Sequence, residues 1–260
     1  MRLHFLGTSS GLPTALRASQ TIALETDAGA LVLLDVADGA SYLLLRQGLD
    51  HADVTDIVIS HMHADHHSGL AQFLKTAMHQ KRTAPLRLFA PAEGISALQA
   101  YLTASYIVPE WLGYQIEWLA IEPEQRLGAG GTLLAVHNEH LARVRPRAAA
   151  LAAAPASWAF ESYSFVLELG EFRLVYAGNL DKRASEIADL AADADAVIME
   201  LAHIKHDTLE QDIAQWRGPV LVTHLHPSYD SERRQELLDW FAEQSKAVLM
   251  EDGAAYELHG

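Results

Sequence analysis

The residues with the clearest chemistry in this sequence form one short cluster, His61-Met62-His63-Ala64-Asp65-His66. The cluster directly follows an apolar run, Asp56–Ser60, whose length and β-branched content are typical of a buried strand, so we expect it on the turn at that strand's carboxyl end. Neutral imidazoles and carboxylates are the ligands that hold zinc and similar divalent ions. Four such ligands on one tight turn would crowd a single ion. The spacing therefore favours two adjacent ions over one. The alternative to a metal site is a solvated, histidine-rich loop.

Further candidate ligands follow other predicted strands. His140 lies four residues after an expected strand at Thr132–Val136, and His224 directly follows one at Pro219–Thr223. The run Gly178-Asn179-Leu180-Asp181 follows a third. Strand ends at one sheet edge converge in space, and ligands gather at such an edge in open α/β architectures. An isolated histidine is more often a hydrogen-bonded structural residue, but several strand ends with metal-compatible residues together predict a metal site.

Strand-like and helix-like runs alternate along the chain. Three hairpins are expected, over Thr21–Thr26 with Ala30–Asp35, Tyr163–Leu169 with Glu171–Ala177, and Ala247–Met250 with Ala254–Leu258. The pattern also predicts strands at Leu86–Ala90 and Ala196–Glu200, and helices at Ala40–Gln47, Leu70–Gln80, Glu93–Ser105, Ala184–Ala192, Leu209–Gln215 and Ser231–Gln244. Interleaved hairpins and helices favour helices that cover mixed sheets. No linker divides the chain, so we expect one domain over residues 1–260.

Composition favours a globular protein of the cytoplasm. A hydrophobic fraction of 50% over 260 residues is enough for a sizeable core. The sequence has no cysteine, so disulfides and thiolate metal ligands are excluded. The apolar run after Met1 is too short for the core of a signal peptide, and no run approaches the roughly 18 apolar residues of a membrane span. We therefore expect a soluble, cytoplasmic protein without a membrane partner.

The formal net charge of −15 bears on the substrate. Long polyanions such as tRNA or DNA are usually bound by clustered lysine and arginine, whereas here 19 basic residues face 34 acidic ones. The densest basic stretch, Arg143–Arg147, could hold one phosphate or form a solvated loop. Beside it, the alanine-rich stretch Ala148–Ala156 predicts a surface excursion that could act as a lid. We therefore expect a small-molecule substrate and no broad nucleic-acid binding.

The cluster at residues 61–66 resembles the HxHxDH signature of the metallo-β-lactamase superfamily. The N-terminal run Leu6–Thr14, with Arg17, is similar to the opening of its ribonuclease Z and phosphodiesterase branch. The later motifs follow in the family's order, namely His140, Gly178-Asn179 and Thr223-His224. The resemblance spans nearly the whole chain. It implies an α+β fold, a four-layer αββα sandwich of two mixed sheets flanked by helices, with a dinuclear centre, usually zinc, at one edge of both sheets.

The resemblance also implies which residues hold metal. His61, His63 and His140 would hold one ion, and Asp65, His66 and His224 would hold the other. Asn179 stands where the family usually has an aspartate that bridges both ions, and its neutral amide oxygen is the weaker ligand. We therefore expect one or two zinc ions, with manganese or iron as alternatives. The second ion should bind less tightly, unless Asp181 substitutes for the bridge.

The expected chemistry follows from the ions. A divalent ion lowers the pKa of bound water from about 15.7 towards about 7 and stabilises charge on a carbonyl or phosphoryl oxygen, so the predicted attacking group is a metal-bound hydroxide. Asp65 could both bind metal and orient or deprotonate this water. His203 follows the predicted strand Ala196–Glu200 and is a candidate proton donor to the leaving group, or else a surface residue that begins a helix.

Departures from true ribonuclease Z argue against tRNA processing. That enzyme carries a His-Glu-Ala-Thr segment, whereas this chain has Met199-Glu200-Leu201-Ala202-His203, and we find no insertion that resembles the enzyme's tRNA-gripping arm. We predict a metal-dependent hydrolase that acts on a phosphodiester or a similar small ester. A lactone or thioester hydrolase is the alternative among enzymes, because the same hydroxide attacks acyl carbons. A metal-binding protein with reduced or lost turnover is the other alternative, because Asn179 replaces the bridging aspartate. A homo-oligomer is left open.

Overall fold

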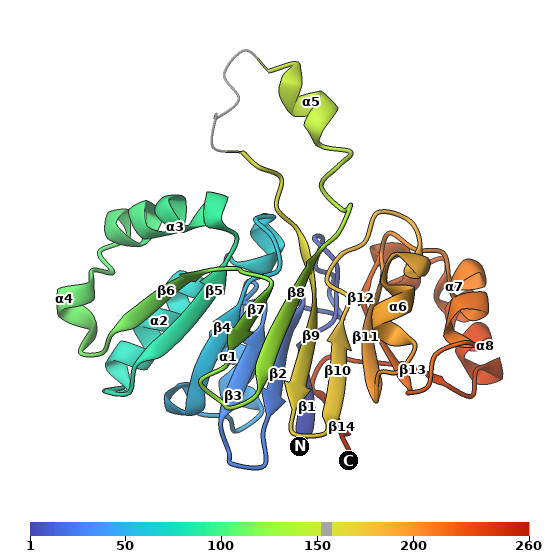
Figure 1. Cartoon of the computed structure of the whole chain (residues 1–260), viewed down its shortest axis with the longest axis horizontal. Coiled ribbons are helices and arrows are strands. Elements are labelled where there is room, and N and C mark those ends of the chain that lie inside the picture. Colours follow the sequence, from blue (N-terminus) through green and yellow to red (C-terminus); the bar gives the residue numbers. More distant parts are fainter. Residues whose placement is uncertain (152–157, 260) are drawn as a thin grey trace.

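The computed structural model of the protein describes residues 1–151 and 158–259 and contains two sheets of seven strands each (Figure 1). The first sheet contains, in spatial order, β14 (Ala254–Glu257), β1 (Arg2–Gly7), β2 (Thr21–Glu25), β3 (Leu31–Leu34), β4 (Val54–Val58), β5 (Leu86–Ala90) and β6 (Ile116–Ala120). The second contains β13 (Ala247–Leu249), β12 (Val220–Leu225), β11 (Ala196–Leu201), β10 (Phe172–Tyr176), β9 (Tyr163–Leu169), β8 (Thr132–His137) and β7 (Glu124–Arg126). Both sheets mix parallel and antiparallel neighbours.

Helices cover the outer face of each sheet (Figure 1). Beside the first sheet lie α1 (Ala40–Arg46), α2 (Leu70–His79), α3 (Ala92–Ala104) and α4 (Pro109–Leu112), and beside the second lie α6 (Ala188–Ala191), α7 (His206–Ile213) and α8 (Arg234–Glu243). Short 3-10 turns are η1 (His51–Asp53), η2 (Ala64–His66), η3 (Ala184–Ile187) and η4 (Pro227–Asp230). The predicted four-layer αββα sandwich is confirmed. Among the described residues, no helix is both long and apolar enough to cross a membrane.

Three apolar cores fill the spaces between the four layers. The central core lies between the sheets and contains Leu3 and Phe5 of β1 together with Leu221 of β12. Each outer core lies between one sheet and its helices. Successive side chains of a strand point to opposite faces, so Ile57 enters an outer core while its neighbour Val58 enters the central one. A strand that is covered on both faces is therefore apolar throughout, which explains the continuous apolar run before the histidine cluster.

The connections place many loops at one edge of both sheets. β3, β4, β5 and β6 run parallel to one another, and so do β10, β11, β12 and β13, so their carboxyl ends share an edge within each sheet. Isolated bridges join Ser9 to Leu225 and His61 to Ser162 at this edge. Loops that are far apart in the sequence are thereby brought against one another, as ligand sites in such architectures require.

The expected C-terminal hairpin is wrong. β13 pairs in parallel with β12 in the second sheet, whereas β14 pairs antiparallel with β1 in the first. Asp252, which lies between the two strands, accepts hydrogen bonds from the backbone N–H groups of Thr8 and Ala18. These long-range bonds hold the segment where it crosses between the sheets. β1, β6 and β7 are additional to the predicted strands, and α7 begins three residues before its predicted start at Leu209.

The chain between β8 and β9 rises above the layers and carries α5 (Arg145–Ala149) (Figure 1). It emerges at the edge where the loops gather. The predicted surface excursion, Ala148–Ala156, starts within α5 and agrees with this projection as far as residue 151. Residues 152–156 of that prediction lie outside the described residues.

Candidate metal centre

Three histidines from two loops form the first group of candidate ligands. His61 and His63 lie on the loop after β4, and His140 lies at the base of the excursion after β8. Nδ1 of His63 is 2.9 Å from Nε2 of His61 and 3.3 Å from Nε2 of His140. Around a tetrahedral zinc ion with ligands at about 2.0–2.1 Å, neighbouring ligand atoms lie about 3.4 Å apart. The spacing of these three nitrogens therefore fits one ion.

Asp65, His66 and His224 form a second group directly beside the first. Nε2 of His66 is 3.1 Å from Oδ2 of Asp65, and the ring centroids of His66 and His224 are 5.3 Å apart. The ring centroids of His61 and His66 are only 4.0 Å apart, so the two groups adjoin. The structure thus brings together the six residues that the family resemblance implies, in the same two sets. Their role as metal ligands stays a prediction.

The protein environment keeps two of these histidines in the form that binds metal. Burial, together with the neighbouring histidines, lowers the pKa of His61 well below its usual value. Burial and the nearby His203 lower the pKa of His140 to about 2. Because a neutral imidazole is the metal-binding form, no proton has to leave either side chain before an ion can bind at neutral pH.

His66 differs because two carboxylates face it. Burial alone would lower its pKa, but the charges and hydrogen bonds of Asp35 and Asp65 raise it to about 10. Burial would raise the pKa of Asp65, yet its hydrogen bond with His66 and the charge of His66 lower it below its usual range. The two carboxylates therefore favour a positive charge at this position. A divalent cation would satisfy them in place of the imidazole proton.

Hydrogen-bond partners outside the two ligand groups orient the rings of His66 and His140 toward the site. Nδ1 of His66 is 2.7 Å from Oδ2 of Asp35, and Nδ1 of His140 is 3.2 Å from the carbonyl oxygen of Leu180. Such contacts fix the ring and direct Nε2 at a metal. Asp35 is fully buried and also accepts hydrogen bonds from the backbone N–H of Ser60 and the hydroxyl of Tyr176. Sequence reasoning missed Asp35, although it ends a predicted strand at the same sheet edge as the other candidates.

Asp35 and His224 are held in the left-handed backbone region, with φ of 59° and 50°. This conformation costs a residue other than glycine on the order of 1–3 kcal/mol, and such strained residues cluster at functional sites. His224 is also the extra residue of a β-bulge, because Glu200 pairs with Thr223 while Leu201 pairs with Leu225. The strand predicted to end at Thr223 therefore continues to Leu225, and the bulge places the His224 ring beside His66.

Asn179 faces the second group. Its Nδ2 lies 3.2 Å from Nε2 of His66, while its Oδ1 is buried and has no hydrogen-bond partner among the described residues. A half-rotation of the amide exchanges these two atoms, so either can point at His66. An orphaned acceptor beside candidate ligands suits a cation. Asp181 belongs to neither group, and its nearest opposite charges are Arg143 at 3.9 Å and Lys182 at 4.0 Å.

His203 lies at the site and not on a remote surface. Its ring centroid is 4.8 Å from that of His140 and 6.0 Å from that of His224, and its side chain is 23% exposed. Oε1 of Glu200 is 3.2 Å from Nδ1 of His203, and Oε2 accepts the backbone N–H groups of Ala202 and His203. The buried Glu200 thereby orients the ring with Nε2 available to a substrate. The position of Glu200 at the end of a predicted strand was the one sequence signal that could have identified this role.

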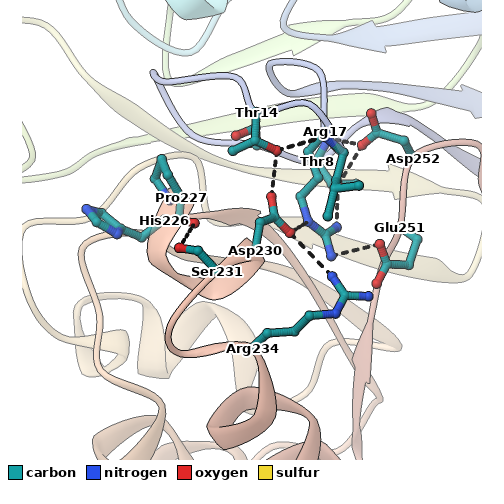
Figure 2. A network of polar contacts seen from close by, with 12 residues as sticks. Thr8, Thr14, Arg17, His226, Pro227, Asp230, Ser231, Arg234, Glu251 and Asp252 are labelled. Atoms are coloured by element: carbon teal, nitrogen blue, oxygen red, sulfur yellow. Dashed lines mark hydrogen bonds and ion pairs between the residues drawn. The ribbon is translucent and has the colours of Figure 1, made fainter.

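The N-terminal loop is held by a buried arginine, Arg17 (Figure 2). Arg17 Nε donates to Asp230 at 2.8 Å, and its other nitrogens contact Thr8 and Glu251, each at 2.7 Å. The loop lies against the second group, since a Cβ on Gly11 would be 3.3 Å from Oδ2 of Asp65. The N-terminal run that resembles the family's opening therefore packs against the second ligand group and supports it.

Arg17→Met should destabilise the fold by up to about 3–5 kcal/mol, because it leaves the nearly buried Asp230 carboxylate with only the more distant and more exposed Arg234 as a cation, at 3.8 Å. Arg17→Lys keeps the charge but loses the forked geometry, so it should cost less. Urea unfolding followed by circular dichroism measures both values. Arg46→Met, which changes an exposed arginine, serves as the control. A loss below about 0.5 kcal/mol for Arg17→Met would show that the network does not hold the loop.

Comparison with known proteins relates most of the chain to a described family. Residues 1–248 match the family model described as "Anti-Pycsar protein Apyc1". A ribonuclease Z of Pseudomonas putida is 37% identical over 123 residues, which is 47% of this chain and 37% of that protein. The matched stretch thus spans well under half of that relative.

Solved structures share the fold over almost the full length. The short form of human tRNase Z superimposes with a TM-score of 0.74 at 17% identity and covers 100% of both chains. The metallo-β-lactamase fold protein YhfI from Bacillus subtilis superimposes with a TM-score of 0.72 at 15% identity and covers 98% of both chains. At these identities the likeness concerns the fold alone.

Proposed function

The chain belongs to the family of the Anti-Pycsar protein Apyc1, within the ribonuclease Z and phosphodiesterase branch of the metallo-β-lactamase superfamily, and from this premise we propose that it is a metal-dependent phosphodiesterase. The observation that carries the proposal is the pair of adjoining ligand groups at one sheet edge. Two neighbouring cations can contact both the attacking and the leaving oxygen of a phosphodiester. The ribonuclease Z relatives support the same reaction class.

The candidate residues would have two roles, metal binding and proton transfer. His61, His63 and His140 would hold one ion, and Asp65, His66 and His224 would hold the other, with zinc as the expected metal. Bound there, divalent ions would lower the pKa of water and polarise a phosphoryl oxygen. Asp65 is ionised at neutral pH and can orient the attacking water. His203, oriented by Glu200, can give a proton to the leaving oxygen.

Substrate screening together with metal analysis tests this proposal. The purified protein should hydrolyse bis(p-nitrophenyl) phosphate or a cyclic nucleotide, and a chelator should abolish the reaction while added zinc or manganese restores it. Lactones and thioesters should react at least about tenfold more slowly. Faster hydrolysis of a lactone or thioester would favour the acyl-hydrolase alternative. Full metal occupancy with no hydrolysis of any substrate would favour a metal-binding protein that has lost turnover.

Asn179→Asp should tighten binding of the second ion by on the order of 1–3 kcal/mol, because a charged oxygen replaces a neutral one beside His66. The wild-type protein should accordingly carry fewer than two tightly bound ions, and phosphodiesterase activity should rise with the substitution. Titration calorimetry measures the affinity, and elemental analysis measures the occupancy. Asn179→Ala, which removes the oxygen altogether, should change the affinity in the opposite direction. Unchanged affinity in both variants would exclude residue 179 from the ligand set.

A further inference from the structure

A cavity of about 550 Å³ opens beside the candidate metal centre. Its walls are mainly apolar and aromatic and include Met62, Leu98, Tyr101, Leu141, Trp158 and Phe160. A volume of this size suits a small-molecule ligand. Among the lining residues that the structure describes, none is a lysine or an arginine. The cavity therefore suits an uncharged group and not a second phosphate.

The cavity is continuous with the first ligand group. His63 belongs to that group and also lines the cavity, and Met62 lies between His61 and His63 on the same loop. Helix α3 forms another wall and packs tightly on this loop, because a Cβ on Gly94 would lie 2.2 Å from the sulfur of Met62. A molecule with one group at the metal ligands can therefore place a neighbouring group in the cavity.

The aromatic wall at the base of the excursion is held by Glu93, on the first turn of α3. The Glu93 carboxylate accepts the backbone N–H groups of Ala159, Phe160 at 3.0 Å and Glu161 at 2.8 Å. Glu161 in return accepts the backbone N–H of Glu93 at 2.8 Å. Phe160 has a left-handed backbone with φ of 60°, which turns successive N–H groups toward one carboxylate. The wall is thus formed before a ligand binds, and the Glu93 charge is engaged by the backbone and not by a ligand.

We propose that this cavity, the apolar pocket, binds an uncharged aromatic or bulky apolar group on the ester, so that the substrate class is phosphodiesters with one such substituent. This inference rests on the proposed function, in which metal ions held by the two ligand groups would take the phosphate. Burial of an aromatic ring against apolar walls favours binding in proportion to the area removed from water. The pocket then selects among phosphodiesters by the size and polarity of this substituent.

Binding without turnover gives a test of the pocket that does not depend on activity. Chelator-treated protein is titrated by calorimetry with 2-naphthyl methyl phosphate and with dimethyl phosphate. The naphthyl ester should bind at least about tenfold more tightly. Ala97→Trp, at an exposed position that lines the pocket, should abolish this preference, and Phe160→Ala should weaken it. Ala100→Trp, an exposed position of the same helix outside the pocket lining, is the matched control and should leave the preference intact.

Hydrolysis by the metal-loaded protein separates this inference from the proposed function. With a common trifluoroethanol leaving group, which supplies no aromatic ring, the 2-naphthylmethyl diester should show a KM at least about tenfold lower than the methyl diester, and Ala97→Trp should remove the difference. Equal binding of both esters by the wild type, or an Ala97→Trp protein that keeps the preference, would contradict the proposed role of the apolar pocket. A naphthyl preference in binding without hydrolysis of either ester would overturn the proposed function and leave the pocket standing.

Discussion

Replacing His63 with alanine is expected to remove most of the bound metal and to lower kcat/KM for phosphodiester hydrolysis by more than about a hundredfold. Loss of a residue that only orients a ligand typically costs about 10–100-fold in affinity or activity, and His63 would itself be a ligand. Its Nδ1 lies within 3.3 Å of ring nitrogens of both His61 and His140, so its removal opens the whole first group. Elemental analysis and steady-state kinetics give the two values.

The fold should survive this substitution, because His63 is only partly buried and lies on a loop at the sheet edge. Circular dichroism and the melting temperature should both stay close to those of the wild type. His79→Ala, which removes an exposed histidine at the end of α2, controls for the general loss of an imidazole. Wild-type metal content in the folded His63→Ala protein would exclude this residue as a ligand.

Asp65→Asn should separate metal binding from turnover. The amide can still offer an oxygen to an ion, but it cannot accept a proton from water, so kcat should fall by about 10²–10⁴-fold while much of the metal stays bound. Asp65 suits this role because His66 keeps its pKa low and Gly11 leaves room at its carboxylate. Kinetics and elemental analysis on the same preparation provide the comparison.

The control for Asp65→Asn is Asp53→Asn, an exposed carboxylate near the opposite end of β4. It should change neither kcat nor metal content. If the Asp65→Asn protein turned over substrate at the wild-type rate with metal still bound, the proposed hydroxide mechanism would be wrong. Asp65 would then be at most a peripheral ligand.

Strands and helices whose signals are local could be predicted closely. The strand at Leu86–Ala90 matches the structure residue for residue, and the helix from Leu70 ends within one residue of its predicted end. A short apolar run between polar turns suits a strand covered on both faces, and a helix reveals itself by its period. Both signals are contained within about ten neighbouring residues.

Features that depend on distant partners could not be predicted in this way. β13 and β14 look like a hairpin, but each is paired with a strand far away in sequence. The bulge at His224 exists because β11 and β12 shift register there. Asp35 gains its role from His66 and Tyr176, which lie 31 and 141 residues away along the chain.

The sequence by itself determined the types and order of the candidate ligands, because the HxHxDH cluster and the later histidines are read directly from residue identity and spacing. Only the tertiary structure decided that these residues form two adjoining groups, that Asn179 faces the second and that His203 lies beside the first. The tertiary structure also formed the apolar pocket, whose walls come from the loop after β4, from α3 and from the excursion between β8 and β9. The physical reason is that a site at a sheet edge is built from loops that long-range strand pairing brings together. The energy of that pairing depends on both partner strands, so no single segment of the chain reveals it.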